Sequence, residues 1–175
     1  VPDSGVHDTE WFQPSFDDSS WIAGTNGAGY EAGQGFEKLI TPNFNFIGQM
    51  HNKATSLYLR FPFKIDDLDA IHANKNLLLR MKCDDAFVAY INGHEVARMN
   101  APENAQWNSR ATDSGDDGAN STFASFNINK HKDKLNKGQN LLAIHGLNIS
   151  PESTDLLVVT ELQTSEHDYK DAIWE

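Results

Sequence analysis

Residues 76–99, NLLLRMKCDDAFVAYINGHEVARM, decide the fold class of this 175-residue sequence. Between 77 and 83 every odd position is apolar, while Arg80 and Lys82 occupy even positions. This alternation has the period of a β-strand with one buried face. Residues 86–91 are apolar throughout, which predicts a strand that is covered on both faces.

A β-hairpin is predicted directly after these two strands. Asn92-Gly93 separates residues 86–91 from residues 94–99, which form another strand-like run. A type I′ turn needs positive φ at both of its central residues, and Asn-Gly tolerates that conformation better than other pairs. The order of the runs therefore predicts an antiparallel hairpin.

The same alternation appears in residues 56–65, where every odd position is apolar. Pro62 lies within this run and lacks the N–H that a central strand donates, so we expect this strand at a sheet edge or beside a bulge. Three further strands are expected at 123–128, 141–147 and 156–162. Two short helices are expected at 66–74 and 130–136. Many short strands with little helix predict an all-β sandwich.

Three long loops connect the predicted strands. Residues 24–35 contain five glycines, residues 43–55 are mostly polar, and residues 100–122 form the longest connection. Loops longer than about 12–15 residues in a compact domain are usually functional or disordered. Trp107 lies in the longest loop, which makes it the first candidate for contact with a ligand.

Length and composition limit the domain organisation and the classes of partner. We expect one β-sandwich domain over residues 1–165 and a tail or linker over residues 166–175. The formal net charge of −11 argues against nucleic acid or an anionic membrane surface as the partner. No apolar run approaches the roughly 20 residues that span a bilayer. The single cysteine, Cys83, excludes a disulfide framework and is expected to be buried in its strand.

The sequence lacks the common catalytic motifs. It has no G-x-S-x-G elbow, no H-E-x-x-H helix and no phosphate-binding loop, and its seven histidines do not have ligand spacing. Adjacent carboxylates do not supply the separation of about 5–9.5 Å that a glycosidase needs across a sugar cleft. We therefore expect a chain that is not an enzyme. The adjacent aspartates are Asp17-Asp18, Asp66-Asp67, Asp84-Asp85 and Asp116-Asp117.

Four stretches of this sequence resemble galactose-binding-like jelly-roll domains. They are WFQPSFDDSSW at 11–21, CDDAFVAYINGHEVARMNAP at 83–102, FNINKHKDKLNKGQNLLAIHGLN at 126–148 and STDLLVVTEL at 153–162. The resemblance implies a jelly-roll β-sandwich with Trp21 as a core-facing anchor, and we expect Trp11 to belong to the core as well. It also implies a non-catalytic module of a bacterial extracellular multidomain protein, secreted or at the cell surface.

The function that this resemblance implies is carbohydrate binding. Such a module targets an attached enzyme or surface protein to a polysaccharide and is tethered to a catalytic domain in the parent chain. The alternative is a structural or interaction module that docks a neighbouring catalytic domain and has no glycan ligand of its own, because the fold alone does not determine function.

A carbohydrate site needs an aromatic ring for the flat face of the sugar and polar groups for its hydroxyls. We expect Trp107 to be the ring, with polar side chains from the hairpin and the loops around it. The alternative is that Trp107 plugs the end of the sandwich and Arg98 pairs with a carboxylate. The candidate site residues are Trp107, Arg98, Arg110, Tyr30, Asn92, His94 and Asn148.

Two further hypotheses concern charged side chains. If the strands at 56–65 and 76–83 were neighbours, four cations would line one face and could hold an acidic polysaccharide; otherwise this is a solvated face. These cations are Arg60, Lys64, Arg80 and Lys82. No cofactor is required, although Asp84-Asp85 also resembles the calcium-holding pair of PA14-type adhesin domains. A tight turn without structural calcium is the expected role of this pair, partly because those domains usually have glycine where this sequence has Ala86.

Overall fold

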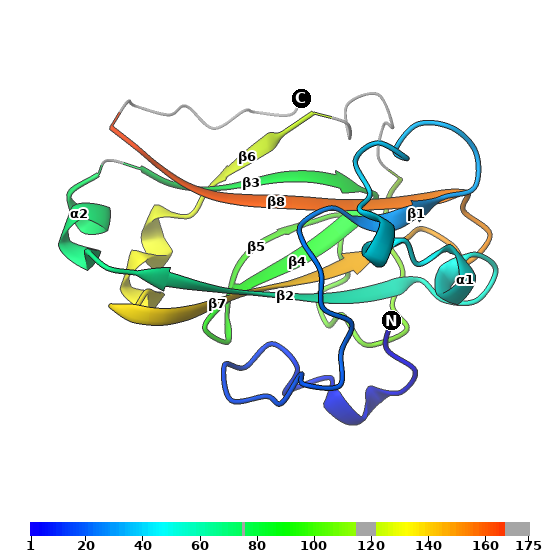
Figure 1. The fold of residues 1–175 in the computed structure, drawn as a ribbon, viewed down its shortest axis with the longest axis horizontal. Helices are drawn as coiled ribbons and strands as arrows, with labels where there is room; N and C mark the ends of the chain where they lie inside the picture. Colours follow the sequence, from blue (N-terminus) through cyan, green and yellow to red (C-terminus); the bar gives the residue numbers. More distant parts are fainter. Residues whose placement is uncertain (75, 115–121, 167–175) are drawn as a thin grey trace.

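Two four-stranded antiparallel sheets pack face to face in the computed structural model, which describes residues 1–74, 76–114 and 122–166 (Figure 1). We name the two sheets after one long strand in each, β8 and β7. The β8 sheet contains β1 (Ala28–Glu31), β8 (Asp155–Ser165), β3 (Asn76–Asp84) and β6 (Ala124–Asn127), in this order. The β7 sheet contains β2 (Ser56–Ile65), β7 (Gly138–Leu147), β4 (Ala86–Ile91) and β5 (His94–Met99). The predicted all-β sandwich is confirmed.

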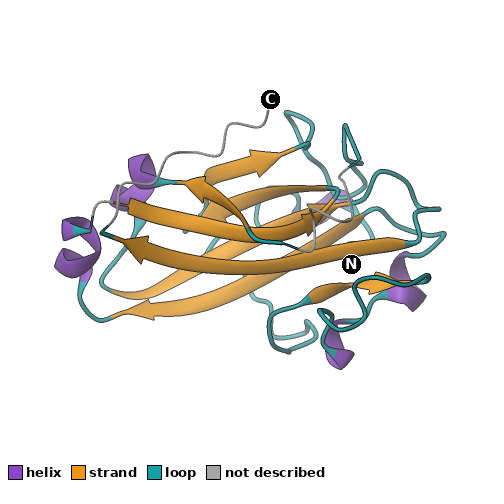
Figure 2. Cartoon of the chain, turned by 90° about the horizontal axis from the view of Figure 1, so that it is seen from above, coloured by secondary structure: helices purple, strands orange, loops and turns teal. Residues whose placement is uncertain are grey.

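Helices are short and lie toward the ends of the sandwich (Figure 2). They are η1 (Gly5–His7), η2 (Pro42–Phe44), α1 (Ile47–Met50), α2 (Leu68–Ala73) and η3 (Asn129–Lys134). Helix α2 lies within the predicted range, and the carboxylate of Asp67 caps it by accepting the N–H of Ala70 at 3.0 Å. The second predicted helix forms as the 3-10 helix η3. No helix among the described residues is long and apolar enough to cross a membrane.

The core between the sheets consists of the side chains that the alternation pattern predicts. Odd positions of β2 and β3 meet even positions of β7 and β8 there. The buried members from these strands include Leu57, Leu59, Leu77, Leu79, Met81, Cys83, Leu142, Ile144, Leu156 and Val158. Burial and the neighbouring carboxylates of Asp84 and Asp85 raise the pKa of the Cys83 thiol, so this cysteine is a packed side chain rather than a nucleophile.

The hairpin and the edge proline are both confirmed. Asn92 and Gly93 have φ values of 49° and 87°, as a turn of this type requires. Strand β2 is an edge strand in which Pro62 lies opposite Leu141. On its other side, the N–H of Leu141 donates to the side-chain Oδ1 of Asn92 at 2.8 Å, and the carbonyl of Leu141 accepts the backbone N–H of Asn92 at 3.0 Å. Leu141 therefore needs no donor from residue 62.

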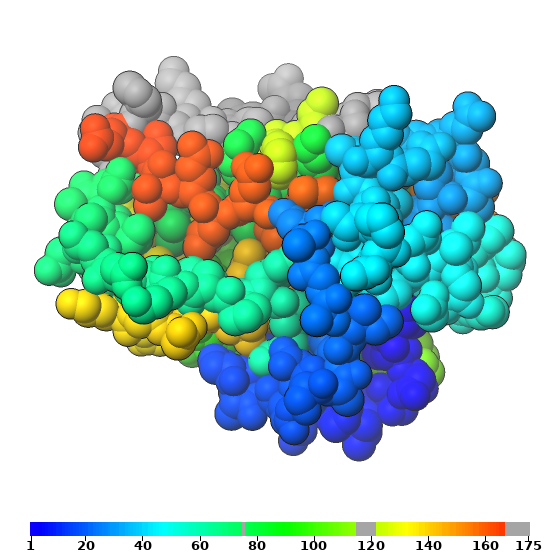
Figure 3. Space-filling model, in the orientation of Figure 1, coloured from blue at the N-terminus to red at the C-terminus, as the bar shows by residue number. Residues whose placement is uncertain are grey.

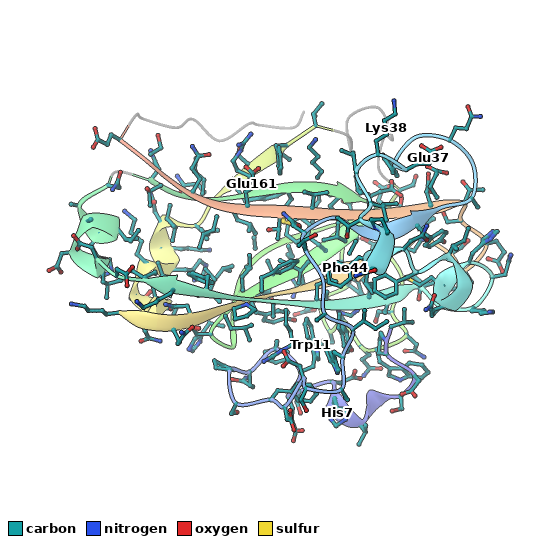
Figure 4. The ribbon with its side chains drawn as sticks, in the orientation of Figure 1. His7, Trp11, Glu37, Lys38, Phe44 and Glu161 are labelled. Carbon is teal, nitrogen blue, oxygen red and sulfur yellow. The ribbon has the colours of Figure 1, made fainter. Side chains whose placement is uncertain are left out.

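The outer face of the β7 sheet is covered by residues 1–21, which we call the N-terminal segment. In Figure 4 the ring of Trp11 points from this segment toward the sheet. It is only 2% exposed and stacks on Tyr58 with a centroid distance of 4.1 Å, while Phe12 stacks on Tyr90 at 4.4 Å. This second apolar layer explains why β4 is buried on both faces, as its sequence predicts.

Two loop predictions need correction. Residues 24–35 contain strand β1, and residues 43–55 contain helix α1. The glycines of the first stretch serve the sheet, because a Cβ on Gly29 would lie 1.8 Å from the carbonyl oxygen of Leu156 on β8. Gly29 permits the close approach of the two backbones but has no side chain that could contribute to an alternation pattern, so the strand was not predicted.

The condition for a four-cation face is not met. Arg60 and Lys64 lie on β2 in the β7 sheet, whereas Arg80 and Lys82 lie on β3 in the β8 sheet. The two strands have the same alternation but belong to opposite layers, so their outward side chains point away from each other. Residues 167–175 of the predicted tail lie outside the described residues.

Candidate functional site

A groove of about 770 Å³ lies where the N-terminal segment passes the edge strand β2. Figure 3 shows this face, on which the segment, in blue, meets the cyan stretch that carries η2 and α1. The volume falls within the range of roughly 300–1,000 Å³ that small-molecule sites occupy. The aromatic side chains that line the groove are Trp21, Phe44, Phe46, Tyr58 and Phe61. The polar ones include Asp3, Ser4, His7, Asp18, Ser20, Gln49 and Arg60.

Arg60 fixes the wall of the groove. Its Nε donates to Asp18 Oδ2 at 2.6 Å, and its terminal nitrogens donate to the carbonyl oxygens of Trp11, Gln13 and Phe16. The Arg60 side chain is only 6% exposed. One cation therefore holds three backbone carbonyls and one carboxylate of the N-terminal segment against β2, and little of its charge is left for a ligand.

Trp21 is positioned by a tight turn that begins at Asp17. The N–H of Ser19 donates to Asp17 Oδ1 at 3.0 Å, which lowers the pKa of that carboxyl, and the N–H of Trp21 donates to the carbonyl of Asp18 at 2.8 Å. The indole packs with its edge against Phe16, with ring centroids 5.5 Å apart. It stays partly exposed, so Trp21 is less buried than the core role we predicted and presents part of its ring to the groove.

The opposite wall comes from η2 and the residues that follow it. Phe44 and Phe46 are almost fully buried, with centroids 6.0 Å apart. A Cβ on Gly24 would lie 2.7 Å from the ring of Phe44, so glycine lets the crossing backbone approach this ring. Ile22, beside it, is 58% exposed and gives the groove an apolar rim.

Asp8 connects the groove to the longest loop. Its Oδ1 accepts the hydroxyl of Tyr58 at 2.9 Å and the backbone N–H of Trp107 at 3.0 Å. Burial, together with the bond to Asp8, raises the pKa of Tyr58. The ring of Trp107 lies against Gly5, where a Cβ would be 3.0 Å from the indole. Trp107 therefore packs on the N-terminal segment.

Replacing Asp8 by alanine is expected to lower the free energy of unfolding by about 1–3 kcal/mol, because it leaves the Tyr58 hydroxyl and the Trp107 N–H without their acceptor. Urea unfolding followed by tryptophan fluorescence measures this loss. The matched control is Glu10→Ala, since Glu10 is exposed and lies 3.7 Å from exposed His7, and its effect should stay within about 0.5 kcal/mol. Equal effects of the two variants would contradict a structural role for Asp8.

The structure does not bring the seven predicted site residues together. Asn92 and His94 lie at the hairpin between β4 and β5, whereas Trp107 and Arg110 follow the other end of β5. A six-residue strand is about 20 Å long, so the two groups lie at opposite ends of the sheet. The amide of Asn92 binds Lys134 O at 2.7 Å and Asn140 Oδ1 at 2.8 Å and thus holds the turn. His94 and Arg110 are exposed.

Arg98 and the pair Tyr30–Asn148 are engaged within the protein. Arg98 binds both carboxylate oxygens of Glu95 at 2.6 and 2.7 Å, as the alternative interpretation expected, and this raises its pKa. Tyr30 and Asn148 are 0% exposed and bind each other at 2.9 Å. Burial raises the pKa of Tyr30 to about 12. These two side chains stabilise one end of the sandwich and have no surface that a sugar could contact.

The Asp84-Asp85 pair is buried between β3 and β4, with exposed fractions of 1% and 4%. Asp85 Oδ2 accepts the N–H of Ile149 at 2.7 Å, which ties the turn to the end of β7. Within the described ranges, no group of three His, Cys, Asp or Glu side chains could hold a metal ion. The expectation that calcium is not required stays a prediction.

Sequence reasoning missed the groove because its walls come from three separate stretches, around residues 1–24, 44–49 and 58–62. One signal was available. WFQPSFDDSSW concentrates aromatic residues immediately before a turn-forming Asp-Asp-Ser-Ser. We assigned its second tryptophan to the core, whereas the structure leaves part of that ring exposed.

No protein-family model and no curated protein matches the sequence. Solved structures do match. β-Glucuronidase from Bacteroides uniformis is 16% identical, with a TM-score of 0.50, over 86% of this chain and 16% of that chain. B. uniformis β-glucuronidase 2 is 17% identical with a TM-score of 0.49, over 86% and 16% of the two chains. A glycosyl hydrolase family 2 member from Bacteroides cellulosilyticus DSM 14838 is 15% identical with a TM-score of 0.40, over 86% and 18%.

Two of these structural neighbours are β-glucuronidases, and the third is a glycosyl hydrolase family 2 member. The chain spans only 16–18% of their length. The likeness to B. uniformis β-glucuronidase, at a TM-score of 0.50 and 16% identity, shows a shared fold and no more.

Proposed function

We propose that this chain is a non-catalytic carbohydrate-binding domain, which brings an attached enzyme or surface protein to a polysaccharide. The observation that carries the proposal is the groove beside β2, where aromatic rings and hydrogen-bonding side chains converge. The jelly-roll resemblance of the sequence supports it. The likeness to B. uniformis β-glucuronidase, which this chain matches over 16% of that chain, also supports it.

The groove offers the two kinds of contact that a sugar ring needs. The exposed part of Trp21 can stack on the C–H face of the ring, and the apolar rim at Ile22 extends this contact. Asp3, Ser20 and Gln49 can accept or donate hydrogen bonds to hydroxyls at the edge of the ring. Asp18 is held in an ion pair with Arg60. Such a carboxylate is better suited to accept a hydrogen bond at a fixed position than to act as a general acid or base.

Replacing Trp21 by alanine is expected to weaken binding at least tenfold, because stacking on an aromatic anchor contributes on the order of 1–3 kcal/mol. Affinity gel electrophoresis in β-glucan, xylan and galactomannan measures the retardation of the chain. The melting temperature should change little, since the ring is partly exposed.

Trp107→Ala is the matched control for the Trp21 variant. Trp107 packs against the N-terminal segment, so its removal should lower the melting temperature and leave retardation in place. Loss of retardation in Trp107→Ala at an unchanged melting temperature would return the site to the longest loop, as the sequence first predicted. Loss in neither variant would contradict both sites.

A second groove, which is mainly apolar, favours the alternative function, a module that docks a neighbouring catalytic domain. It measures about 400 Å³ and opens between the edges of β2 and β8. Its lining is mainly apolar and includes Phe61, Phe63, Ile65, Ile71 and Leu162. Failure of the chain to bind any glycan, together with stable association with the catalytic domain of its parent protein, would favour this function over carbohydrate binding.

A further inference from the structure

We infer that the groove beside β2 selects uncharged glycans and rejects those that carry carboxylate or sulfate groups. This inference rests on the proposed function, and it concerns the chemical class of the ligand at the same site. It is based on the charged groups that face the groove and on what each of them already binds.

Arg60 is the only Lys or Arg among the residues that line the groove, all of which are described in the structure. Its guanidinium already donates hydrogen bonds to the carboxylate of Asp18 and to three backbone carbonyls, and its side chain is 6% exposed. A ligand anion could recruit this cation only by breaking the bonds that hold the N-terminal segment on β2. No arginine is therefore available for the bidentate contact by which proteins recognise carboxylate or sulfate.

The remaining charged groups favour a neutral ligand. The carboxylates of Asp3 and Asp18 both line the groove, and the Asp18 side chain is 43% exposed. Asp18 gives Oδ2 to Arg60, and no described residue binds its Oδ1. His7 is exposed and lies 3.7 Å from Glu10, which adds a third carboxylate nearby.

An anionic sugar would lose water at its charged group and gain two carboxylates as neighbours, with no free cation in return. Such a transfer is unfavourable because a charge that leaves water needs a partner. The net charge of −11 adds repulsion at long range. The hydroxyls of a neutral sugar can donate hydrogen bonds to the same carboxylates, because ionised carboxylates act only as acceptors.

The cations that could attract an anionic polysaccharide lie on the other sheet. Arg80 and Lys82 on β3 both approach the ring of Phe123, at 4.5 and 4.9 Å from its centroid. Arg80 also binds Glu161 at 2.9 Å, on the outer face of the β8 sheet, away from the groove. Binding of an anionic glycan at that face can be separated from binding in the groove by mutation.

The test is affinity gel electrophoresis of the full chain at 20 mM and 150 mM NaCl. The probes are neutral β-glucan and galactomannan, and anionic polygalacturonate and alginate. We expect retardation by a neutral probe at both salt concentrations and none by the anionic probes. Trp21→Ala should weaken the neutral retardation at least tenfold, and Trp21→Phe, which keeps an aromatic ring, should retain a measurable part of it. Circular dichroism checks that both variants fold.

The other outcomes separate the two proposals. Retardation by an anionic probe that is lost in Trp21→Ala would overturn the selectivity inferred here and leave a carbohydrate site in the groove. Retardation only by anionic probes, steeply dependent on salt and lost in Arg80→Ala but not in Trp21→Ala, would overturn the groove itself as the binding site. No retardation by any probe would overturn the proposed function and this inference with it.

Discussion

Replacing Arg60 by methionine is expected to lower the free energy of unfolding by about 3–5 kcal/mol. The substitution keeps most of the side-chain length but removes every donor. The carbonyls of Trp11, Gln13 and Phe16 and the carboxylate of Asp18 then lose their common partner beneath the N-terminal segment. Urea unfolding gives the loss of stability, and limited proteolysis should cut the segment earlier than in the unmodified chain.

Arg80→Met is the matched control for this variant. Arg80 also forms an ion pair with a carboxylate, but both members are solvent-accessible, with side-chain exposures of 32% and 46%. Exposed pairs contribute at most about 1 kcal/mol, so this variant should remain close to the unmodified chain. If the two methionine variants were equally stable, Arg60 could not be the clamp that holds the segment.

Acid is expected to destabilise this protein through His145. The imidazole is 1% exposed, and its Nε2 lies 3.0 Å from the hydroxyl oxygen of Ser56. The rings of Trp11 and Tyr58 face it edge-on, with centroids 6.0 and 4.7 Å away. Burial lowers the pKa of His145 to about 3, so the folded protein keeps this side chain neutral well below pH 6.

The direction of the effect follows from proton binding. Below a pH of about 6.5 the unfolded chain protonates this histidine and the folded protein does not, so acid favours unfolding. Above a pH of about 6.5, His145 does not lower the free energy of unfolding. Below that pH, the free energy of unfolding decreases by about 1.4 kcal/mol for each pH unit down toward 3. At pH 5 this amounts to about 2 kcal/mol.

Unfolding by urea at pH 7, 6 and 5 measures this slope. His145→Gln should lose it, because glutamine can still bind Ser56 but takes up no proton. His7→Gln serves as the control, since His7 is exposed and should leave the slope unchanged. Carboxylates also titrate in this range, so the informative quantity is the difference between the unmodified chain and each variant. An identical pH dependence in all three proteins would contradict the assignment to His145.

The sequence by itself determined the strands and their buried faces. Odd positions of β2 and β3 point into the core because side chains alternate along any extended backbone, whatever the rest of the chain does. The hairpin at Asn92-Gly93 and the edge position of Pro62 are also local, since they depend on allowed φ values and on a missing N–H. Where a local signal was absent, as at Gly29, the strand was missed.

The tertiary structure alone decided which strands share a sheet and where a ligand could bind. Arg60 and Arg80 both occupy outward-facing even positions of an alternating strand. Arg60 nevertheless holds the N-terminal segment, whereas Arg80 pairs with Glu161 on the opposite sheet. The loop residues that we grouped into one site are separated by the length of a strand. Alternation fixes which side of its own strand a residue occupies, but the segment that covers that side comes from about 40 residues away. The groove exists only because that segment crosses β2.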